Sequence, residues 1–379
     1  MRATLFLEIG PLQEQQYSGV AMVTLALTRH RLLYHPEDTR FFIGQHLIGR
    51  TSVEAVVGAG SGSLLQALIV QGIAATDMVA NEVRRCPLPV ALFPSVKSVD
   101  DRIFKRSLQV VHDLSILLNP ELHDAETIAF HGGTILRDLS SNDRTICVSS
   151  STADHLAIYL GVPRERIVIA HPGGDHSSLF ETGTGVLAPD AALPPYILVP
   201  GTIEPRKNID LILHALAEHP RLTDAYRWVF FGAPGWLIAF ENRIVYHHLE
   251  TPYAASRIEW LNYVGDHCKA FLYRHAELTV YPSLFEGFGI PVIEAMHHGC
   301  PVVCSFSSGI PEAGGDAAFY FDPTSPAEFV DTLQSALRRC RLSGTAIRNR
   351  CLRHAADFTW ERFARTVDEA ILKCAAETV

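Results

Sequence analysis

Two glutamates, Glu286 and Glu294, stand eight positions apart around a glycine-rich turn that contains Gly287 and Gly289. An apolar run before the turn predicts a buried strand, and Pro291 after it is typical of the first turn of a helix. The free N–H groups and the dipole at such a helix start attract anions, and glycine lets the backbone approach a ligand closely. Two carboxylates beside a phosphate site suit a ligand with sugar hydroxyls on either side of a diphosphate.

Two cationic side chains, Arg206 and Lys207, stand immediately before a helix that the apolar pattern predicts over residues 209–218. At that place they can pair with phosphate oxygens, which the helix start also attracts. The competing interpretation is an exposed, solvated pair. In the same way, a glycine turn between strand and helix is common in α/β proteins, so the turn at 287–289 does not by itself establish a binding site.

A histidine and an aspartate, His112 and Asp113, follow a buried strand predicted at 108–111. Ligands of α/β sheets gather beyond the carboxyl ends of the strands, so this position favours a functional role. Asp113 would either orient the imidazole or support its loop, and the alternative is a core histidine that Asp113 satisfies. Gly19 lies in another strand-to-helix loop, 10–19, where an ordinary tight turn is an equally good interpretation.

The elements that must position these residues alternate between predicted strands and helices, as in an α/β protein. At 379 residues the chain is too long for one ordinary core, so two domains are expected. The predicted division is a first domain at 1–175, a linker at 176–195, a second domain at 196–358 and a final helix at 359–379. The linker is assigned because it is rich in glycine, threonine, alanine and proline and has no apolar periodicity.

Composition argues against several classes of protein. The formal net charge of −9 disfavours a nucleic-acid partner, which needs a basic face, and no apolar run approaches the roughly 20 residues of a membrane helix. The first nine residues predict a strand rather than a signal peptide, because Glu8 interrupts their apolar run. Eight cysteines without a Cys-x-x-Cys pair indicate reduced thiols in a cytoplasmic protein. His297 and His298 lack matching ligands, so no metal site is expected there.

Residues 281–323, which include EGFGIPVIEAMHHGCPVV and SGIPEAGGDAAFYFDP, resemble the C-terminal signature of retaining glycosyltransferase family 4. Further matches lie at 200–210, 110–121, 147–156 and 171–175, while the first hundred residues match loosely. The resemblance implies the GT-B fold, an α/β architecture in which two Rossmann-like domains face each other across a cleft. It also implies that the second domain binds the nucleotide, that the first holds the acceptor, and that the last helix crosses back to the first domain.

The resemblance also implies roles for single residues. Glu294 would take the ribose hydroxyls of the donor, and Glu286 would hold hydroxyls of the transferred sugar, near which His112 would lie. The glycine-rich turn that contains Gly287 and Gly289 is called the central turn below. Arg206 and Lys207, with the N–H groups of the central turn, would stabilise the leaving diphosphate. The implied catalytic residues are Glu286, His112, Lys207 and Arg206, and the implied donor-binding residues are Glu294, Gly287, Phe288, Gly289, Ile290, Gly19, Gly201 and Asp113.

The implied function is retaining transfer of a hexose from a nucleotide diphosphate sugar to a glycan or lipid-linked glycan in polysaccharide biosynthesis. Fixed cations and helix dipoles would balance the diphosphate, and no Asp-x-Asp pair is present, so neither a cofactor nor a divalent metal is required. Within the family, the His-Asp-Leu and Glu-Gly-Phe-Gly-Ile-Pro sequences resemble those of bacterial polysaccharide mannosyltransferases, which favours GDP-mannose over a UDP-hexose. The expected location is the cytoplasm, with or without peripheral contact at the inner face of the cell membrane.

Three alternatives stay open. A sugar-nucleotide epimerase on the same fold would need an added acid/base set that the first domain does not show. A phosphorylase would need a pyridoxal-phosphate lysine and a far longer chain, and a non-catalytic binding subunit is the third alternative. Retention without a clear enzymic nucleophile suggests front-face attack assisted by the leaving phosphate, while two-carboxylate hydrolysis is the competing chemistry.

Overall fold

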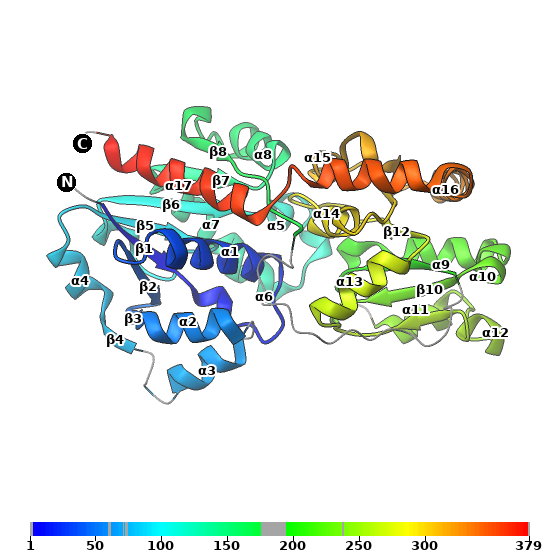
Figure 1. Ribbon diagram of the computed structural model, residues 1–379, viewed down its shortest axis with the longest axis horizontal. Coiled ribbons are helices and arrows are strands. Elements are labelled where there is room, and N and C mark those ends of the chain that lie inside the picture. Colours follow the sequence, from blue (N-terminus) through cyan, green and yellow to red (C-terminus); the bar gives the residue numbers. More distant parts are fainter. Residues whose placement is uncertain are drawn as a thin grey trace.

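The structure, a computed structural model, describes residues 3–59, 62–70, 72, 75–175, 195–236 and 239–377. Within these residues the chain forms two α/β units that lie next to each other along the long axis of the molecule (Figure 1). The first unit is built on an eight-stranded sheet and the second unit on a six-stranded sheet. The predicted architecture of two Rossmann-like units is therefore confirmed.

The sheet of the first unit is parallel over most of its width. Its strands are β1 (Thr4–Glu8), β2 (Thr39–Ile43), β3 (His46–Ile48), β4 (Ala75–Met78), β5 (Pro89–Phe93), β6 (Arg106–Val111), β7 (Arg144–Cys147) and β8 (Ile167–Ile169). They stand in the order β4-β3-β2-β1-β5-β6-β7-β8, and β3 and β4 add an antiparallel edge. Every residue of β5 is buried, because a strand in the middle of a parallel sheet is covered on both faces.

Eight α-helices precede residue 176 within the described part of the first unit. They are α1 (Gly19–Tyr34), α2 (Arg50–Ala59), α3 (Gly62–Val70), α4 (Val79–Arg85), α5 (Ser115–Leu118), α6 (Ala125–Thr127), α7 (Gly133–Ser140) and α8 (Ser150–Leu160). The Ser18 side chain caps α1 by accepting a hydrogen bond from the N–H of Ala21. Between α6 and α7 the chain forms a π-helical turn, Ile128–Gly132, and such turns are frequent at functional sites.

The sheet of the second unit is parallel throughout. Its strands are β9 (Tyr196–Pro200), β10 (Arg227–Phe231), β11 (Ile258–Trp260), β12 (Leu278–Tyr281), β13 (Val302–Ser305) and β14 (Phe319–Phe321), in the order β11-β10-β9-β12-β13-β14. Large aromatic side chains such as Trp228, Phe230 and Tyr281 are almost completely buried in this unit. Their burial removes a large apolar area from water and stabilises the sheet that carries the central turn.

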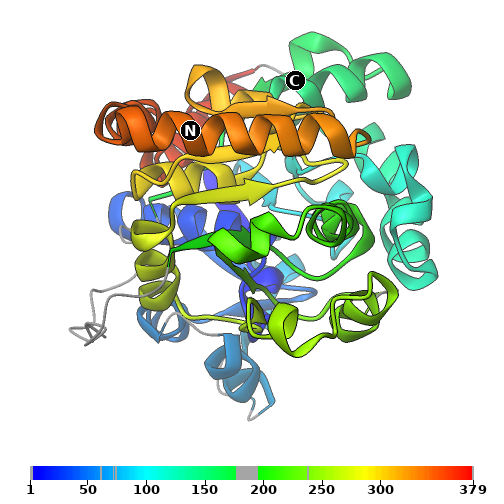
Figure 2. The ribbon, with the colours of Figure 1, turned by 90° about the vertical axis from the view of Figure 1, so that its right-hand side faces the viewer.

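The helices of the second unit surround this sheet. They are α9 (Ile209–Glu218), α10 (Arg221–Ala225), α11 (Phe240–Tyr246), α12 (Pro252–Ala255), α13 (Asp266–His275), α14 (Ile290–His297), α15 (Ile310–Gly314) and α16 (Pro326–Ala355). Figure 2, in which the second unit faces the viewer, shows α16 lying across one side of the unit. Ser325 caps α16 by accepting from the N–H of Glu328, and Pro326 opens the helix, as the sequence pattern favours.

The last helix, α17 (Trp360–Ala376), lies in the first unit beside α1 and contacts β6 and β7 (Figure 1). Phe363, Val367 and Ile371 belong to its buried face. The chain thus returns from the second unit to the first after α16. Residues 176–194 of the predicted linker lie outside the described residues, so the division of the chain around 176–195 stays a prediction.

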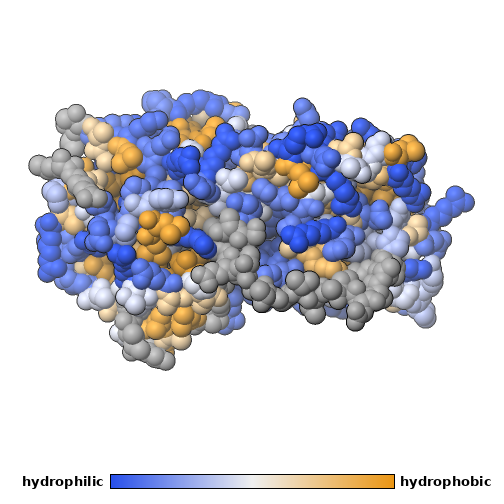
Figure 3. All heavy atoms as spheres, in the orientation of Figure 1, coloured by the Kyte–Doolittle hydropathy of each residue, from blue (hydrophilic) through white to orange (hydrophobic). Residues whose placement is uncertain are grey.

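The face of the molecule in Figure 3 is largely hydrophilic. Hydrophobic residues form small separate groups on it, one of them over α3. Among the described residues, no helix combines the length and the apolar character that crossing a lipid bilayer would require.

Candidate active site

The central turn connects β12 to α14, as predicted, and brings the two units into contact. Gly289 has φ of +110°, a backbone conformation that residues with a side chain rarely adopt. A Cβ atom on Gly287 would lie 1.9 Å from the carbonyl oxygen of His112, so only glycine allows the turn to approach the end of β6 this closely. The turn and the start of α14 therefore lie directly against the His112 loop of the first unit.

The carboxylate of Glu286 is buried and accepts four hydrogen bonds. Oε2 accepts from Arg206 Nη1 at 2.7 Å, and Oε1 accepts from Lys207 Nζ at 2.5 Å, Ser283 Oγ at 2.6 Å and the Tyr281 hydroxyl at 2.8 Å. Burial alone would raise the pKa of Glu286, but the charges of Arg206 and Lys207 outweigh it and lower the pKa to about 2. Glu286 is therefore ionised and rigidly held.

The two cations come from a 3₁₀ turn, Pro205–Lys207, immediately before α9. Arg206 Nη2 donates to Glu204 Oε1 at 2.8 Å, and Nη1 donates to the Phe285 carbonyl at 3.0 Å as well as to Glu286. Burial opposes the charge of Arg206, yet the Glu286 and Glu204 carboxylates raise its pKa. The Arg206 and Lys207 side chains are only 15% and 13% exposed, so the solvated-surface interpretation of this pair is wrong.

A glycine makes room for the Lys207 side chain. Gly201 follows β9 directly, and a Cβ atom on it would lie 3.4 Å from Lys207 Cδ. The ammonium group of Lys207 reaches past this glycine to the Tyr281 hydroxyl at 2.9 Å. The structure thus brings Gly201, Lys207, Arg206 and Glu286 together beyond the carboxyl ends of β9 and β12 in the second sheet.

Glu294 lies one turn into α14 and has its own set of partners. Its Oε2 accepts from the Tyr273 hydroxyl at 3.0 Å, and its Oε1 lies 3.5 Å from Lys269 Nζ. Lys269 also pairs with Asp266 at 3.2 Å. Sequence reasoning missed Lys269 and Tyr273, although their spacing of four residues places both on one face of α13.

The imidazole of His112 is oriented by a main-chain group. Its Nε2 lies 2.8 Å from the Pro94 carbonyl oxygen, which can only accept, so Nε2 carries the proton. Burial lowers the pKa of His112 and favours the neutral ring, in which Nδ1 is an acceptor. Asp113 instead accepts from Ser115 N–H at 2.8 Å and Ser115 Oγ at 2.6 Å. Of the two roles expected for Asp113, the structure shows support of the loop.

A pocket of about 140 Å³ opens beside His112 in the first unit. Its walls include His131 and Gly132 from the π-helical turn and the apolar side chains Ile116 and Ile135. Sequence reasoning did not assign His131 to the site, although the pair Gly132-Gly133 marked this helix as irregular. The pocket has the mixed polar and apolar lining of a ligand site.

Further contacts join the units around this region. The Glu312 carboxylate of α15 accepts from the N–H groups of Ser150 at 2.7 Å and Ser151 at 2.8 Å, at the start of α8. Trp236 donates from Nε1 to the Leu122 carbonyl at 3.0 Å. These residues were not predicted, because the contacts exist only once both units have folded.

The remaining expected donor-binding residues lie where the two units meet, which is called the junction below. A Cβ atom on Gly19, at the start of α1, would lie 3.4 Å from Ile290 Cδ1, at the start of α14. Phe288 is buried and stacks on the His171 ring with a centroid separation of 5.4 Å. The structure therefore places Gly19, Ile290 and Phe288 between the two units.

The chain is similar to a known protein family and to several named proteins. Residues 191–349 match the family described as glycosyl transferases group 1. The O-antigen chain mannosyltransferase B of Escherichia coli is 31% identical over 266 residues, which cover 68% of this chain and 68% of that protein. The serotype-specific mannosyltransferase WbdA of Escherichia coli is 30% identical over 243 residues, which cover 60% of this chain but only 29% of WbdA.

Solved structures share the fold at low sequence identity. HepE from Anabaena in complex with UDP has a TM-score of 0.64 and 16% identity, over 98% of this chain and 100% of that chain. WaaG, a glycosyltransferase involved in lipopolysaccharide biosynthesis, has a TM-score of 0.63 and 13% identity, over 99% of this chain and 100% of that chain. These similarities support the GT-B arrangement of the two units.

Proposed function

We propose a specific reaction for this glycosyltransferase, which belongs to the glycosyl transferases group 1 family. It transfers mannose, with retention, from GDP-mannose to a glycan or lipid-linked glycan in polysaccharide biosynthesis. Two of the similar proteins are named mannosyltransferases, and the name of one of these refers to an O-antigen chain. Their names support the choice of mannose and of a polysaccharide product.

One observation carries the proposal: two largely buried cations converge beside a helix start at the junction of the units. The first N–H groups of α14 have no partner within the helix, and Arg206 and Lys207 lie beside the turn that precedes it. Together these groups favour the charge that develops on a leaving diphosphate, which is usually the largest contribution to such a transfer. On this proposal neither a metal ion nor another cofactor is needed at the reacting centre.

The Glu286 carboxylate forms ion pairs with both cations in the structure. A diphosphate would compete with it for the same N–H donors, since phosphate oxygens are strong acceptors. We infer that Glu286 then turns part of its hydrogen-bonding capacity toward hydroxyls of the transferred sugar. Glu294, next to Lys269 and Tyr273, would accept from the ribose hydroxyls of the nucleotide.

On the opposite side of the junction, His112 would position the donor sugar. Its Nε2–H is committed to the Pro94 carbonyl, so Nδ1 of the neutral ring is the atom that can accept from a sugar hydroxyl. The adjoining pocket, with Ile116 and His131 in its wall, would receive the acceptor. An acceptor attached to lipid would bring the enzyme to the inner face of the cell membrane as a peripheral protein.

We infer front-face transfer, because Glu286 and Asp113, two carboxylates at the junction, are assigned to roles other than attack on the sugar carbon. Glu286 accepts from four N–H and O–H donors, and Asp113 holds its own loop. In this step the bond between the anomeric carbon and the diphosphate oxygen breaks, and the acceptor oxygen bonds to that carbon on the same face. The acceptor proton passes to the released phosphate oxygen, so no enzymic nucleophile is required.

The test incubates the purified protein with labelled GDP-mannose, UDP-glucose or UDP-N-acetylglucosamine and with octyl α-mannoside as an acceptor probe. We expect label to move from GDP-mannose to the probe, or slowly to water, and NMR to show an α-linked product. GDP should also raise the melting temperature more than UDP does. Interconversion of sugar nucleotides would indicate an epimerase, and binding without turnover would indicate a non-catalytic subunit.

A further inference from the structure

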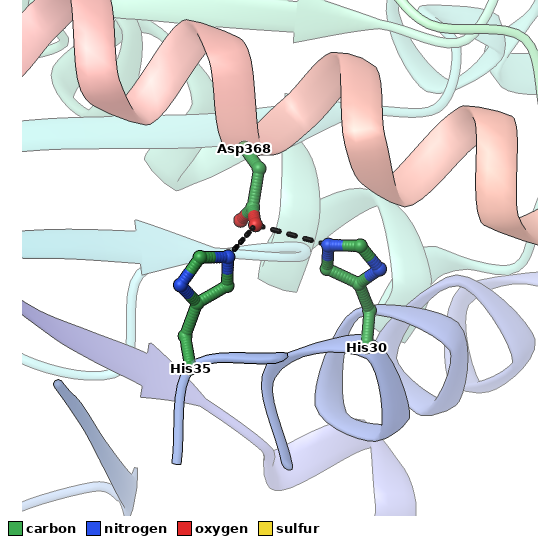
Figure 4. A group of neighbouring side chains, drawn as sticks. All are labelled: His30, His35 and Asp368. Atoms are coloured by element: carbon green, nitrogen blue, oxygen red, sulfur yellow. Dashed lines mark hydrogen bonds and ion pairs between the residues drawn. The ribbon is translucent and has the colours of Figure 1, made fainter. Parts of the chain in front are cut away.

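Three side chains that no sequence motif singled out converge where the last helix meets the first. Figure 4 shows His30, near the end of α1, and His35, which directly follows α1, pointing toward Asp368 of α17. Asp368 Oδ2 lies 3.0 Å from His30 Nε2 and 3.0 Å from His35 Nε2. The three ligand atoms lie within 4.8 Å of one another. Two imidazoles and a carboxylate are a frequent ligand set for zinc-like ions in proteins.

Two of the three spacings among these atoms lie close to those around a tetrahedral ion. Bonds of about 2.0–2.2 Å place the ligand atoms of a tetrahedral Zn²⁺ ion about 3.3–3.5 Å apart. The two nitrogen–oxygen distances of 3.0 Å are a few tenths of an ångström shorter. The His35 side chain is 38% exposed, so it can rotate to widen the site, and water can reach a fourth position.

The carboxylate is already oriented by groups outside the set. Arg31 Nη1 donates to Asp368 Oδ1 at 3.0 Å, and Arg31 Nε donates to Thr39 Oγ1 at 2.9 Å. Oδ1 is thereby fixed, and Oδ2 is the oxygen directed at the histidines (Figure 4). Outer partners of this kind orient the ligands in known metal sites.

The ligand types indicate the kind of ion that the site could hold. The set offers two imidazoles and one carboxylate, so a hard ion such as Mg²⁺ or Ca²⁺, which needs several oxygen ligands, is disfavoured. Imidazole ligands suit Zn²⁺, Ni²⁺ and Cu²⁺ instead.

We propose that His30, His35 and Asp368 bind a zinc-class divalent ion that joins α17 to α1. The residues belong to segments more than 330 positions apart, so the ion would link the returning helix to the body of the first unit. None of the three takes part in the sugar-transfer site described above. The ion would therefore act on stability and leave the chemistry of transfer unchanged.

The test uses the full chain without a polyhistidine tag, first stripped with EDTA and then titrated with ZnCl₂ by calorimetry. We expect one ion per chain and a higher melting temperature with zinc than with EDTA. Co²⁺ bound by the wild-type protein should show the visible absorption of a tetrahedral site. His35→Ala should weaken Zn²⁺ binding by at least about tenfold, since loss of an outer partner alone costs that much in known sites.

His219→Ala is the matched control, because His219 is exposed and lies outside the cluster, and it should bind Zn²⁺ like the wild type. Transfer from GDP-mannose by His35→Ala should stay within about twofold of wild type in EDTA. Equal zinc affinity in His35→Ala and the wild type, or several weak ions per chain, would mean an adventitious ion only and would overturn the proposal. A Co²⁺ spectrum typical of octahedral water ligands would overturn it as well.

Discussion

Replacing Lys207 by alanine removes one of the two cations that contact Glu286, and we expect most turnover to be lost while the fold is kept. The ammonium group lies 2.5 Å from Glu286 Oε1 and 2.9 Å from the Tyr281 hydroxyl, so it is fixed where the proposed diphosphate would form. A fixed charge-assisted contact to a leaving group contributes about 3 kcal/mol in the transition state. The value of kcat should therefore fall about a hundredfold.

The same change has a smaller effect on stability. Glu286 keeps Arg206, Ser283 and Tyr281 as partners, so the buried carboxylate still faces a cation. The free energy of unfolding should fall by about 1.5–3 kcal/mol, the contribution of a hydrogen bond to a charged group. The pKa of Glu286 should rise from about 2, because one of the two charges that lower it is gone. Adding Glu286→Gln should recover part of this stability but none of the turnover.

Single-turnover transfer from GDP-mannose and unfolding in urea measure the two effects separately. Lys105→Ala is the matched control, because Lys105 is exposed and lies outside the site, and it should behave like the wild type. Wild-type kcat in Lys207→Ala would remove the lysine from the reacting centre. Restored turnover in the double variant would also refute the reasoning, since it would mean that Lys207 serves only to neutralise Glu286.

Glu294→Ala should weaken GDP binding at least about tenfold in calorimetry, because the proposed ribose contact exists before and during transfer. Glu312→Gln removes the negative charge of the carboxylate that accepts from two N–H groups at the start of α8. Because this contact joins the two units, the molecule should expand in small-angle scattering and kcat should fall severalfold. Burial raises the pKa of Glu8 to about 7, so the folded state resists ionisation of this carboxyl as the pH rises from about 4.5 through 7. Glu8→Gln should accordingly raise the free energy of unfolding above pH 7, by up to about 3 kcal/mol, and change it little near pH 4.

Each of these expectations has an outcome that contradicts it. Unchanged GDP affinity in Glu294→Ala would remove the ribose role, and Glu286→Gln, which should not weaken GDP binding, is the comparison. Identical scattering curves for Glu312→Gln and the wild type would show that the α8 contact does not hold the units together. A stability difference for Glu8→Gln that is the same at pH 4 and pH 8 would show that ionisation of Glu8 is not its cause.

The parts of the site that follow from local sequence were predictable. β12, the turn and α14 form one continuous segment, so a buried apolar run, two glycines and Pro291 define their geometry without help from the rest of the chain. The same holds for Arg206 and Lys207 before α9. Their burial was not evident, because it depends on Glu286, which is about 80 residues away.

Residues that act across elements were missed for a physical reason. Lys269 and Tyr273 face Glu294 only because α13 packs against α14, and Glu312 reaches α8 only because the two units meet. The position of Asp113 after a buried strand indicated a functional role, but sequence alone could not decide whether Asp113 orients the His112 imidazole or supports its loop. The antiparallel edge formed by β3 and β4 also escaped prediction, because it interrupts the strand–helix alternation.

The position of α17 makes the order of synthesis matter for folding. Residues of the first sheet leave the ribosome early, yet the faces of α1, β6 and β7 that α17 covers have no partner until residues 360–376 have been made. At about 5–20 residues per second, synthesis of the roughly 200 residues from position 176 to the end of α17 takes roughly 10 to 40 s. During that interval the nascent chain presents an apolar surface, which makes it a candidate for chaperone binding and a source of aggregation when translation is slow.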